Sequence, residues 1–569
     1  NALNPAHPML TLNAGTATNN LDWGKLTVDA TNFNSPISTY EAYNLKLMQN
    51  TAGISFTKNS VNTYTANGGI KSVNSGNFEF SIDTLGSLVN TTEVRAAGYQ
   101  YKNHTGATYT AGDGTHTEAW AGRTKVGNKV ENNKLTVTGG SITAAAYGGL
   151  VENHKLDAHG NPRPTGDAEK NTVAVAGGNV ANAYGAEVRT KNGNATENTA
   201  EITNGTVGSV YGASLAAAGA TGTANKSKVN ITGGTINGSV YGGHIANAAA
   251  TGQITNSEVN IAGGSISGTI YGGYNSGSGD AKSGTVNITS GSMGDVYGGY
   301  TVGTGASTGN TVNLGTATTA FAAGTSVGTI FGGNKSTVTD NTLNVNSRNA
   351  RAADVKNFEK VNFDVAHNVS HGDTMLTLTN GAGTTIDWSK MQLKNLDTIT
   401  ASPTENRILT LLNSTNNVTF TNYDPVRARE TKRDGDYEYV LDKDPVNPNK
   451  RVDVIGYRFR NNQPTYSTGS NAEAWGGRTK VGNTVENNTL KITGGTITTA
   501  AHGGLAENTK AGSGSDGYDP SGDASTNKLI LEGGTIADGY GATVRTEAGN
   551  ATQNTVDLKG TTVTGSLYG

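Results

Sequence analysis

The residues best suited to metal chemistry are His154, Asp157 and His159, which lie close together in the sequence. Imidazole nitrogens and carboxylate oxygens are both common ligands of Zn²⁺, so this spacing could form a metal site. The alternative is a solvated polar loop. The chain repeats itself later, and the equivalent stretch at 508–519 contains no histidine. We therefore expect a loop here, with no metal ligand and no other cofactor.

A second candidate for metal binding is the glycine-rich stretch Gly272–Asp280. It faintly resembles the glycine–aspartate nonapeptides that bind Ca²⁺, which recur in tandem along a chain. Here the motif occurs once. We therefore expect no calcium site in this stretch.

A tryptophan followed by two cations occurs at equivalent places in two parts of the chain. These residues could form a ligand patch in which the indole ring stacks on a sugar. The alternative is a structural cap, because the open end of a stack of strands exposes unpaired edges that need covering. We favour the cap. The residues are Trp120, Arg123 and Lys125 in the first copy and Trp475, Arg478 and Lys480 in the second.

Residues for covalent or acid–base catalysis are sparse. The chain contains no cysteine, and its aspartates and glutamates are scattered rather than grouped on adjacent repeats. Polysaccharide lyases built from stacked parallel strands need clustered acids and cations in a groove. We therefore predict no catalytic residues and no enzymatic activity. Because a fold does not fix a function, a carbohydrate-active enzyme stays the alternative.

Composition excludes several classes of protein. The chain has 569 residues, of which 79 are glycine and 34% are hydrophobic, so a large compact core is not expected. The net charge of −3 and the absence of a basic stripe argue against nucleic acid as a partner. No apolar run reaches the length of a membrane span. The lack of cysteine suits a large extracellular protein that its backbone hydrogen bonds hold together.

The elements that must position these residues are short strands in a repeated phrase. VNITGGTINGSVYGG at Val229–Gly243 recurs at Val259–Gly273 and, altered, at Val286–Gly299. Its alternation of apolar and polar residues predicts strands with one buried face, and its glycine pairs permit corners. Each phrase thus predicts three short strands. Such a repeat indicates the stacked turns of a solenoid.

One aromatic residue marks each repeat, at steps of 26 to 37 residues. Three short strands with their turns need roughly 20–25 residues, so each step holds one turn and a variable loop. We predict an all-β fold of right-handed parallel β-helix (β-solenoid) blocks. The markers form either a packing ladder, which we favour, or a stripe that binds carbohydrate. They are Tyr147, Tyr184, Tyr211, Tyr241, Tyr271, Tyr297 and Phe331.

A longer repeat, with an offset of 355 to 366 residues, organises the whole chain. Each copy consists of a β-rich linking segment and a solenoid block, and Phe78-Glu79-Phe80 in the first linking segment corresponds to Tyr437-Glu438-Tyr439 in the second. We expect the sequence to be a length of a longer rod in which the two kinds of segment alternate. The predicted boundaries are 1–116 (linking), 117–347 (solenoid), 348–471 (linking) and 472–569 (start of a second, truncated solenoid).

The phrase ending in Tyr-Gly-Gly, the Asn/Thr/Gly-rich turns, the lack of cysteine and the long tandem blocks together resemble the passenger regions of bacterial autotransporter adhesins and haemagglutinin-type surface proteins. The resemblance covers Thr117–Ser347 and Ala472–Gly569. It implies an elongated extracellular protein, secreted or anchored at the bacterial surface through a region outside this sequence. Its expected partners are a host or bacterial surface protein or glycan, or a second copy of itself. A subunit of a filament or surface layer is a further alternative.

Overall fold

The computed structural model describes residues 9–11, 19–22, 43–57, 71–75, 78–84, 91–100, 108–153, 166–316, 318–335, 339–366, 369–395, 406–423, 429–434, 436–460, 465–508, 522–546 and 548–569. The candidate metal ligands His154, Asp157 and His159 lie outside these residues. The chain divides into two compact units. Unit 1 comprises 1–313 with 324–342, and unit 2 comprises 314–323 with 343–569.

All regular structure in the described ranges is strand, apart from the two short 3-10 turns η2 (Ala111–Asp113) and η3 (Trp388–Lys390). The prediction of an all-β protein is therefore confirmed. Glycine, threonine, asparagine and β-branched residues dominate the repeats, and these residue types suit strands and tight turns rather than helices.

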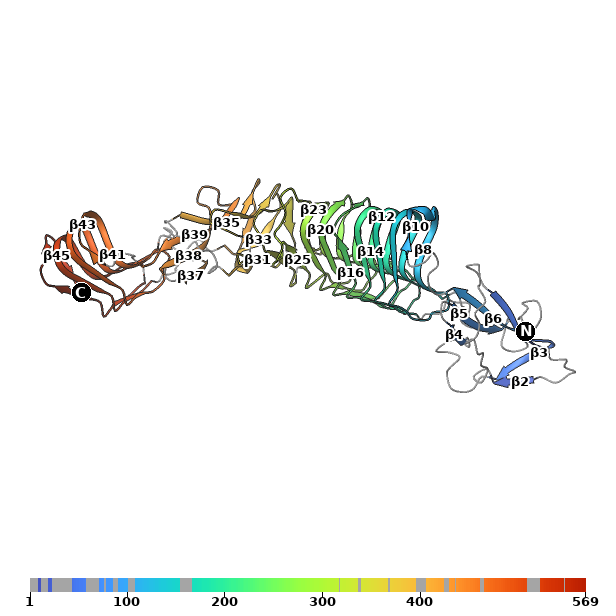
Figure 1. Cartoon of the computed structure of the whole chain (residues 1–569). Helices are drawn as coiled ribbons and strands as arrows, with labels where there is room; N and C mark the ends of the chain where they lie inside the picture. Colours follow the sequence, from blue (N-terminus) through green and yellow to red (C-terminus); the bar gives the residue numbers. More distant parts are fainter. Residues whose placement is uncertain are drawn as a thin grey trace. The chain divides into compact units, whose positions relative to one another are not determined.

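Most of unit 1 is a stack of parallel strands, each paired with the strand at the same position of the next repeat (Figure 1). Tyr147 is paired in this way with Tyr184, and Tyr184 with Tyr211. The chain passes between the units three times, within β25 (Thr311–Leu314), between Ala323 and Gly324, and at the start of β28 (Thr342–Val345). The remaining strands of this stack are β7 (Thr108–Tyr109), β8 (Thr115–Thr124), β10 (Lys134–Val151), β12 (Thr172–Val188), β14 (Thr199–Leu215), β16 (Lys228–Ile231), β17 (Thr235–Ile236), β18 (Val240–Ile245), β20 (Glu258–Ile266), β21 (Ile270–Asn275), β23 (Thr285–Met293), β24 (Val296–Thr301), β26 (Ser326–Val327) and β27 (Thr329–Gly333).

The alternation of residue types decides which side chains enter the core. In β16, Val229 and Ile231 are fully buried, whereas Lys228 and Asn230 lie on the outer face. The paired strand β20 repeats this pattern residue by residue. Each buried aliphatic side chain contributes about 1.5–3 kcal/mol to stability. The core is therefore a thin column of stacked aliphatic residues.

The turns also contain a short strand that the sequence does not predict. The three predicted strands merge into one continuous strand in β10, whose register shifts at the glycine pair between Thr138 and Ser141 and again between Ile142 and Ala146. A further strand of two or three residues follows the variable loop, and this length is too short for an alternating pattern to reveal it. These corner strands form a parallel sheet of their own, made of β9 (Val130–Glu131), β11 (Ala168–Glu169), β13 (Ala195–Thr196), β15 (Thr223–Asn225), β19 (Gln253–Thr255) and β22 (Ala281–Lys282).

Each unit also contains a sheet from a linking segment, and the antiparallel strands of the two sheets share one register. Glu79 is opposite Tyr99 in unit 1, and Glu438 is opposite Tyr457 in unit 2. The resemblance between the two linking segments therefore extends to strand pairing. The strands in unit 1 are β1 (Leu10–Thr11), β2 (Asn19–Asp22), β3 (Tyr43–Thr57), β4 (Lys71–Ser75), β5 (Phe78–Thr84) and β6 (Thr91–Gln100).

The linking segment of unit 2 combines this antiparallel part with parallel pairs. β32 pairs with β29 and β35 in parallel, and β31 pairs with β34 in parallel. Its strands are β29 (Ala350–Ala352), β30 (Asp354–Lys356), β31 (Lys360–Asp364), β32 (Thr374–Leu378), β33 (Thr385–Asp387), β34 (Met391–Lys394), β35 (Asn406–Ser414), β36 (Thr419–Thr421), β37 (Arg429–Asp434), β38 (Tyr437–Lys443) and β39 (Arg451–Arg458).

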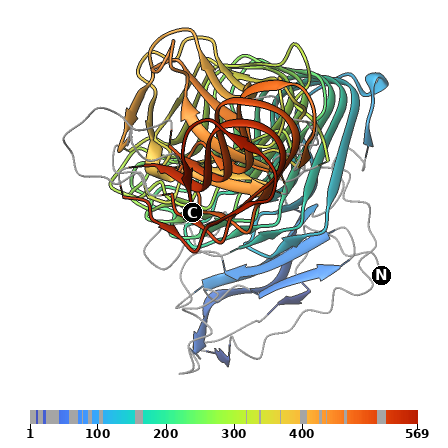
Figure 2. The ribbon, with the colours of Figure 1, turned by 90° about the vertical axis from the view of Figure 1, so that its left-hand side faces the viewer.

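A second stack of parallel strands follows in unit 2, and its last turns wind round a common interior (red in Figure 2). Leu490, Ile492, Leu529 and Leu531 fill that interior. The strands are β40 (Thr465–Tyr466), β41 (Ser470–Thr479), β42 (Val485–Glu486), β43 (Thr489–Glu507), β44 (Ala524–Ser525), β45 (Lys528–Arg545), β46 (Ala551–Thr552), β47 (Thr555–Leu558), β48 (Thr562–Val563) and β49 (Leu567–Tyr568).

Candidate functional site

The tryptophan and the arginine of each candidate patch lie together in the first turn of a stack. Trp120 on β8 is buried and in register with Tyr147, and the guanidinium carbon of Arg123 lies 5.8 Å from the centre of its ring. In unit 2 the guanidinium carbon of Arg478 lies 6.0 Å from the ring of the partly exposed Trp475. Both arginines thus pack over an indole, at the distance of a cation–π contact.

A carboxylate of the next turn holds the first arginine in place. Arg123 Nε donates to Glu152 Oε2 at 2.7 Å, and Arg189 Nη1 donates to Glu152 Oε1 at 2.7 Å. The other amino group of Arg189 bonds Glu187 at 2.7 Å and donates to the hydroxyl of Tyr147 at 2.8 Å. Burial lowers the pKa of Arg123 despite the attraction of Glu152. The paired carboxylate is what makes this buried cation tolerable.

The second copy keeps the central carboxylate of this network. Arg478 Nε donates to Glu507 Oε2 at 2.6 Å, and Arg545 Nη1 donates to Glu507 Oε1 at 2.7 Å. Arg545 Nη2 then donates to Glu473 Oε1 at 2.9 Å. These arginines bind acids of the same stack, so their charge is used to join turns and is not presented to a ligand.

The lysine of each patch donates a hydrogen bond through its backbone N–H. The acceptor is a glutamate that we did not identify from the sequence. Lys125 N donates to Glu79 Oε1 at 2.6 Å, and Lys480 N donates to Glu438 Oε1 at 2.7 Å. Glu79 and Glu438 are both fully buried. Burial raises the pKa of Glu79 from 4.5 to about 7, although its hydrogen bonds lower it. The sequence feature that could have identified both residues is a glutamate between two aromatic residues, at equivalent places in the two linking segments.

Main chain of the linking segment pairs with the first long strand of the second stack. Arg460 forms an antiparallel bridge with Gly477 on β41, and Arg478 N donates to the carbonyl oxygen of Phe459 at 2.7 Å. The fully buried Phe459 packs with Val485 and other residues inside the turns. Covering of an open edge was expected. In unit 2 main chain and a phenylalanine take part in it, and the role of the tryptophan as a cap stays a prediction.

The seven aromatic markers form one stacked column in unit 1. Adjacent rings have centroids 4.3–5.5 Å apart and planes within 3–20° of each other, from Tyr147 and Tyr184 to Tyr297 and Phe331. This spacing follows the distance between neighbouring strands, about 4.8 Å. Burial raises the pKa of Tyr271 to about 12, so its phenol stays neutral at physiological pH.

A shorter set of rings lies beside this column and covers its edges. Tyr274 and Tyr300 are stacked at 5.2 Å, and Tyr300 meets Tyr297 at 5.1 Å with an angle of 85° between the planes. His244 packs against Tyr241 at 4.7 Å, with the two ring planes tilted by 50°. A sugar that stacks on an aromatic residue needs an open ring face, and inside this column the faces cover one another. The geometry therefore favours packing over carbohydrate binding.

The column of unit 2 contains a histidine that the sequence reading missed. Trp475, His502, Tyr540 and Tyr568 are paired in register, and the ring of His502 is stacked on Tyr540 at 5.2 Å. His502 Nδ1 shares a hydrogen bond of 2.8 Å with the hydroxyl of Thr543. Burial lowers the pKa of His502 to about 4. The position thus requires a flat ring that is neutral near pH 7.

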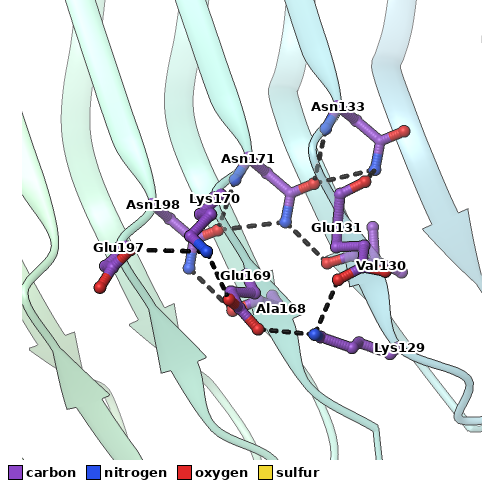
Figure 3. Close-up of polar contacts among 10 residues, drawn as sticks. All are labelled: Lys129, Val130, Glu131, Asn133, Ala168, Glu169, Lys170, Asn171, Glu197 and Asn198. Carbon is purple, nitrogen blue, oxygen red and sulfur yellow. Dashed lines mark hydrogen bonds and ion pairs between the residues drawn. The ribbon is translucent and has the colours of Figure 1, made fainter.

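A ladder of buried asparagines runs inside the corner of the turns (Figure 3). Asn133 Nδ2 donates to Asn171 Oδ1 at 2.9 Å, and Asn171 Nδ2 donates to Asn198 Oδ1 at 3.1 Å. The residue before each has a positive φ, for example 53° at Lys170 and 55° at Glu197, which turns the chain sharply. Asparagine thus supplies bonds between turns that no apolar residue could.

Charged side chains run along the outside of the same corner. Lys129 Nζ lies 2.7 Å from Glu131 and 2.6 Å from Glu169, and Lys170 Nζ lies 3.0 Å from Glu169 (Figure 3). The row alternates in sign and neutralises itself. Exposed ion pairs of this kind contribute little to stability, and they leave no net charge to attract a ligand.

The calcium candidate is occupied by contacts within the protein. Asp280 Oδ1 accepts the backbone N–H of Ala306 at 2.7 Å, and Asp280 Oδ2 is paired with Lys282 Nζ at 2.6 Å. Asp167 and Asp523 likewise accept a backbone N–H from the next turn. Among the described residues, no group of three or more histidines and acids could hold a metal ion.

Two Gly-x-Ser-x-Gly pentapeptides, the pattern of a nucleophile elbow, occur at 305–309 and 324–328 and were overlooked in the search for catalytic residues. An elbow needs an exposed serine between a strand and a helix. Ser307 is buried, its hydroxyl accepts from Asn310 Nδ2 at 3.4 Å, and its pentapeptide lies in the loop between β24 and β25. Ser326 is exposed, but it lies on the short strand β26, which pairs with β23, and the next described element is the strand β27 rather than a helix. The pattern here is a turn of the stack.

None of the described residues forms a helix long and apolar enough to cross a membrane. Comparison of the chain with family models, with curated proteins and with solved structures found no match.

Proposed function

We propose that this chain is an extracellular protein of the bacterial surface, built from right-handed parallel β-helix blocks, that acts in adhesion or self-association. The observation that carries the proposal is the use of the polar side chains. Glu152, Arg189, Asn171 and Asp280, which could serve chemistry, instead bond one turn to the next. A chain whose reactive side chains bond its own turns together is suited to a structural role, in which its outer surface contacts other molecules or cells.

The lack of cysteine supports the same proposal. Disulfides hold many extracellular proteins together, and this chain replaces them with hydrogen bonds repeated at each turn. In such an architecture stability is close to a sum over turns and their interfaces, so it can be lengthened without a new core. This property suits a protein that must reach away from a cell.

The experiment uses beads coated with the chain. We expect the beads to clump with one another or to bind to bacterial or host cells several-fold more than albumin-coated beads do. Beads coated with the Ile231→Asp variant control for the fold, because this change places a carboxylate in the core. The proposal is overturned if coated beads bind nothing while the soluble chain depolymerises a polyuronate, which indicates an enzyme. Ordered polymers of the pure chain would instead indicate a filament subunit.

A further inference from the structure

Both units contain the same contact between a linking sheet and the first turn of the stack that follows it. Thr124 Oγ1 donates to Glu79 Oε2 at 2.8 Å, and Asn128 Nδ2 donates to the same oxygen at 3.0 Å. In unit 2 the corresponding bonds to Glu438 Oε2 are 2.8 Å from Thr479 and 2.9 Å from Asn483. With the backbone N–H of the lysine, three donors therefore converge on each glutamate.

The chemistry of this contact requires an acceptor without a hydrogen of its own. Thr479 Oγ1 already accepts the N–H groups of Val481 at 3.3 Å and Asn483 at 3.0 Å, so its hydrogen points to Glu438. The other two partners are a backbone N–H and an amide NH₂ group. A carboxylate satisfies all three, and such bonds to a charged group are stronger than neutral ones.

The residue beside this contact is anchored in the opposite direction. Arg478 bonds Glu507 of the following turn, whereas Thr479 and Lys480 bond Glu438 of the linking sheet. Consecutive side chains thus bond in opposite directions at this junction, where the main chain of unit 2 adds the bond from Arg478 N to the carbonyl oxygen of Phe459. The same division holds for Arg123 and Thr124 in unit 1.

We propose that Glu79 and Glu438 are interlocks that make each linking sheet and the stack after it one rigid module. The buried carboxylate is the part of the contact that fixes the sheet, while the stack keeps its own hydrogen bonds between turns. Without the carboxylate the sheet becomes mobile with respect to its stack, and the turns stay folded. This inference does not depend on adhesion and concerns only which segments move together.

The test uses the full chain with two spin labels, which its lack of cysteine allows. The labels are placed at the exposed positions Val446→Cys, in the turn that joins β38 and β39 of the linking sheet, and Thr499→Cys on β43, and their distance distribution is measured at pH 8. We expect one narrow distribution in the parent protein. We expect a broad distribution in Glu438→Ala, with an unchanged far-ultraviolet spectrum. The exposed Glu486→Gln is the matched control and should stay narrow.

A second variant covers the case in which Glu438→Ala fails to fold. Asn483→Ala removes one donor and leaves the glutamate in place, so hydrogen exchange at the Lys480 amide should quicken about tenfold. The proposal is overturned if Glu438→Ala folds and keeps the narrow distance distribution. It is also overturned if Asn483→Ala changes neither the exchange rate nor the distances.

Discussion

Replacing Asn171 by alanine tests whether the buried asparagine ladder stabilises the stack. The Asn171 side chain donates to the carbonyl oxygen of Val130 at 2.9 Å and to Asn198 Oδ1 at 3.1 Å. Its own oxygen accepts from Asn133 N at 3.2 Å and from Asn133 Nδ2 at 2.9 Å. Alanine removes all four bonds, inside a site with no exposure to solvent.

The expected cost follows from the net value of a hydrogen bond. At about 1 kcal/mol each, the four bonds give a loss of about 4 kcal/mol in the free energy of unfolding. A water molecule that enters the vacated space recovers part of this loss, so we expect about 3–4 kcal/mol. Asn171→Asp should be at least as harmful, because a carboxylate oxygen would then face two acceptors.

The matched control is Ser227, which occupies the equivalent position two turns after Asn171. Ser227 is fully buried and its hydroxyl has no hydrogen-bond partner among the described residues. Ser227→Ala should therefore change the free energy of unfolding by less than about 0.5 kcal/mol. Denaturant unfolding followed by circular dichroism measures both variants. Equal stability of the two variants would refute the reasoning.

Three other changes have definite expected outcomes. His502 has a pKa of about 4 when folded and 6.5 as its ordinary value, so the unfolded chain binds the proton more readily between these values. The stability of the second stack should therefore fall as the pH drops from 6.5 to 4. In the His502→Tyr variant the melting temperature should depend less on pH over this range. Ile231→Asp should cost several kcal/mol in thermal or denaturant unfolding because the site is fully buried, whereas Ser278→Asp in an exposed loop should be neutral. Gly242→Ala should lower the melting temperature because its Cβ would lie 2.4 Å from a carbonyl oxygen of the next turn, whereas a Cβ at Gly112 meets nothing.

The periodic features of the fold could be predicted from the sequence. The aromatic markers identify equivalent positions, and the pairing of Tyr241 with Tyr271 follows from their common place in the phrase. Alternation also places Ile231 and Val286 in the core. Such positions are visible because a stack repeats one local pattern many times.

The contacts that occur once per block could not be predicted in this way. Glu79 is 45 residues from Thr124, and the local sequence around Glu79 gives no indication of this partner.

Some features that recur in every turn were missed as well. The corner strand β22 has two residues, which is below the length at which alternation is informative. The asparagine before each main strand did recur in the sequence, at Asn171 and Asn198 among others, and was a signal that could have been used.

The differences between the two junctions show what the junction requires. In unit 1, Arg189 bonds the hydroxyl of Tyr147 and the carboxylate of Glu187. In unit 2 these two positions hold His502 and Thr543, which bond each other.

The arginine adapts to this exchange, in which Thr543 replaces the carboxylate of Glu187, whereas the carboxylates of Glu152 and Glu79 are kept as Glu507 and Glu438. Arg545 bonds Glu473 where Arg189 bonds Glu187, while Glu507 holds both arginines of its junction as Glu152 does. The three hydrogen bonds accepted by Glu438 also match those accepted by Glu79, with each donor–acceptor distance equal to within 0.1 Å. The ring position tolerates a change of chemistry because stacking needs only a flat neutral ring. The positions of Glu152/Glu507 and Glu79/Glu438 keep a carboxylate in both units, because each of these groups accepts from several donors at once.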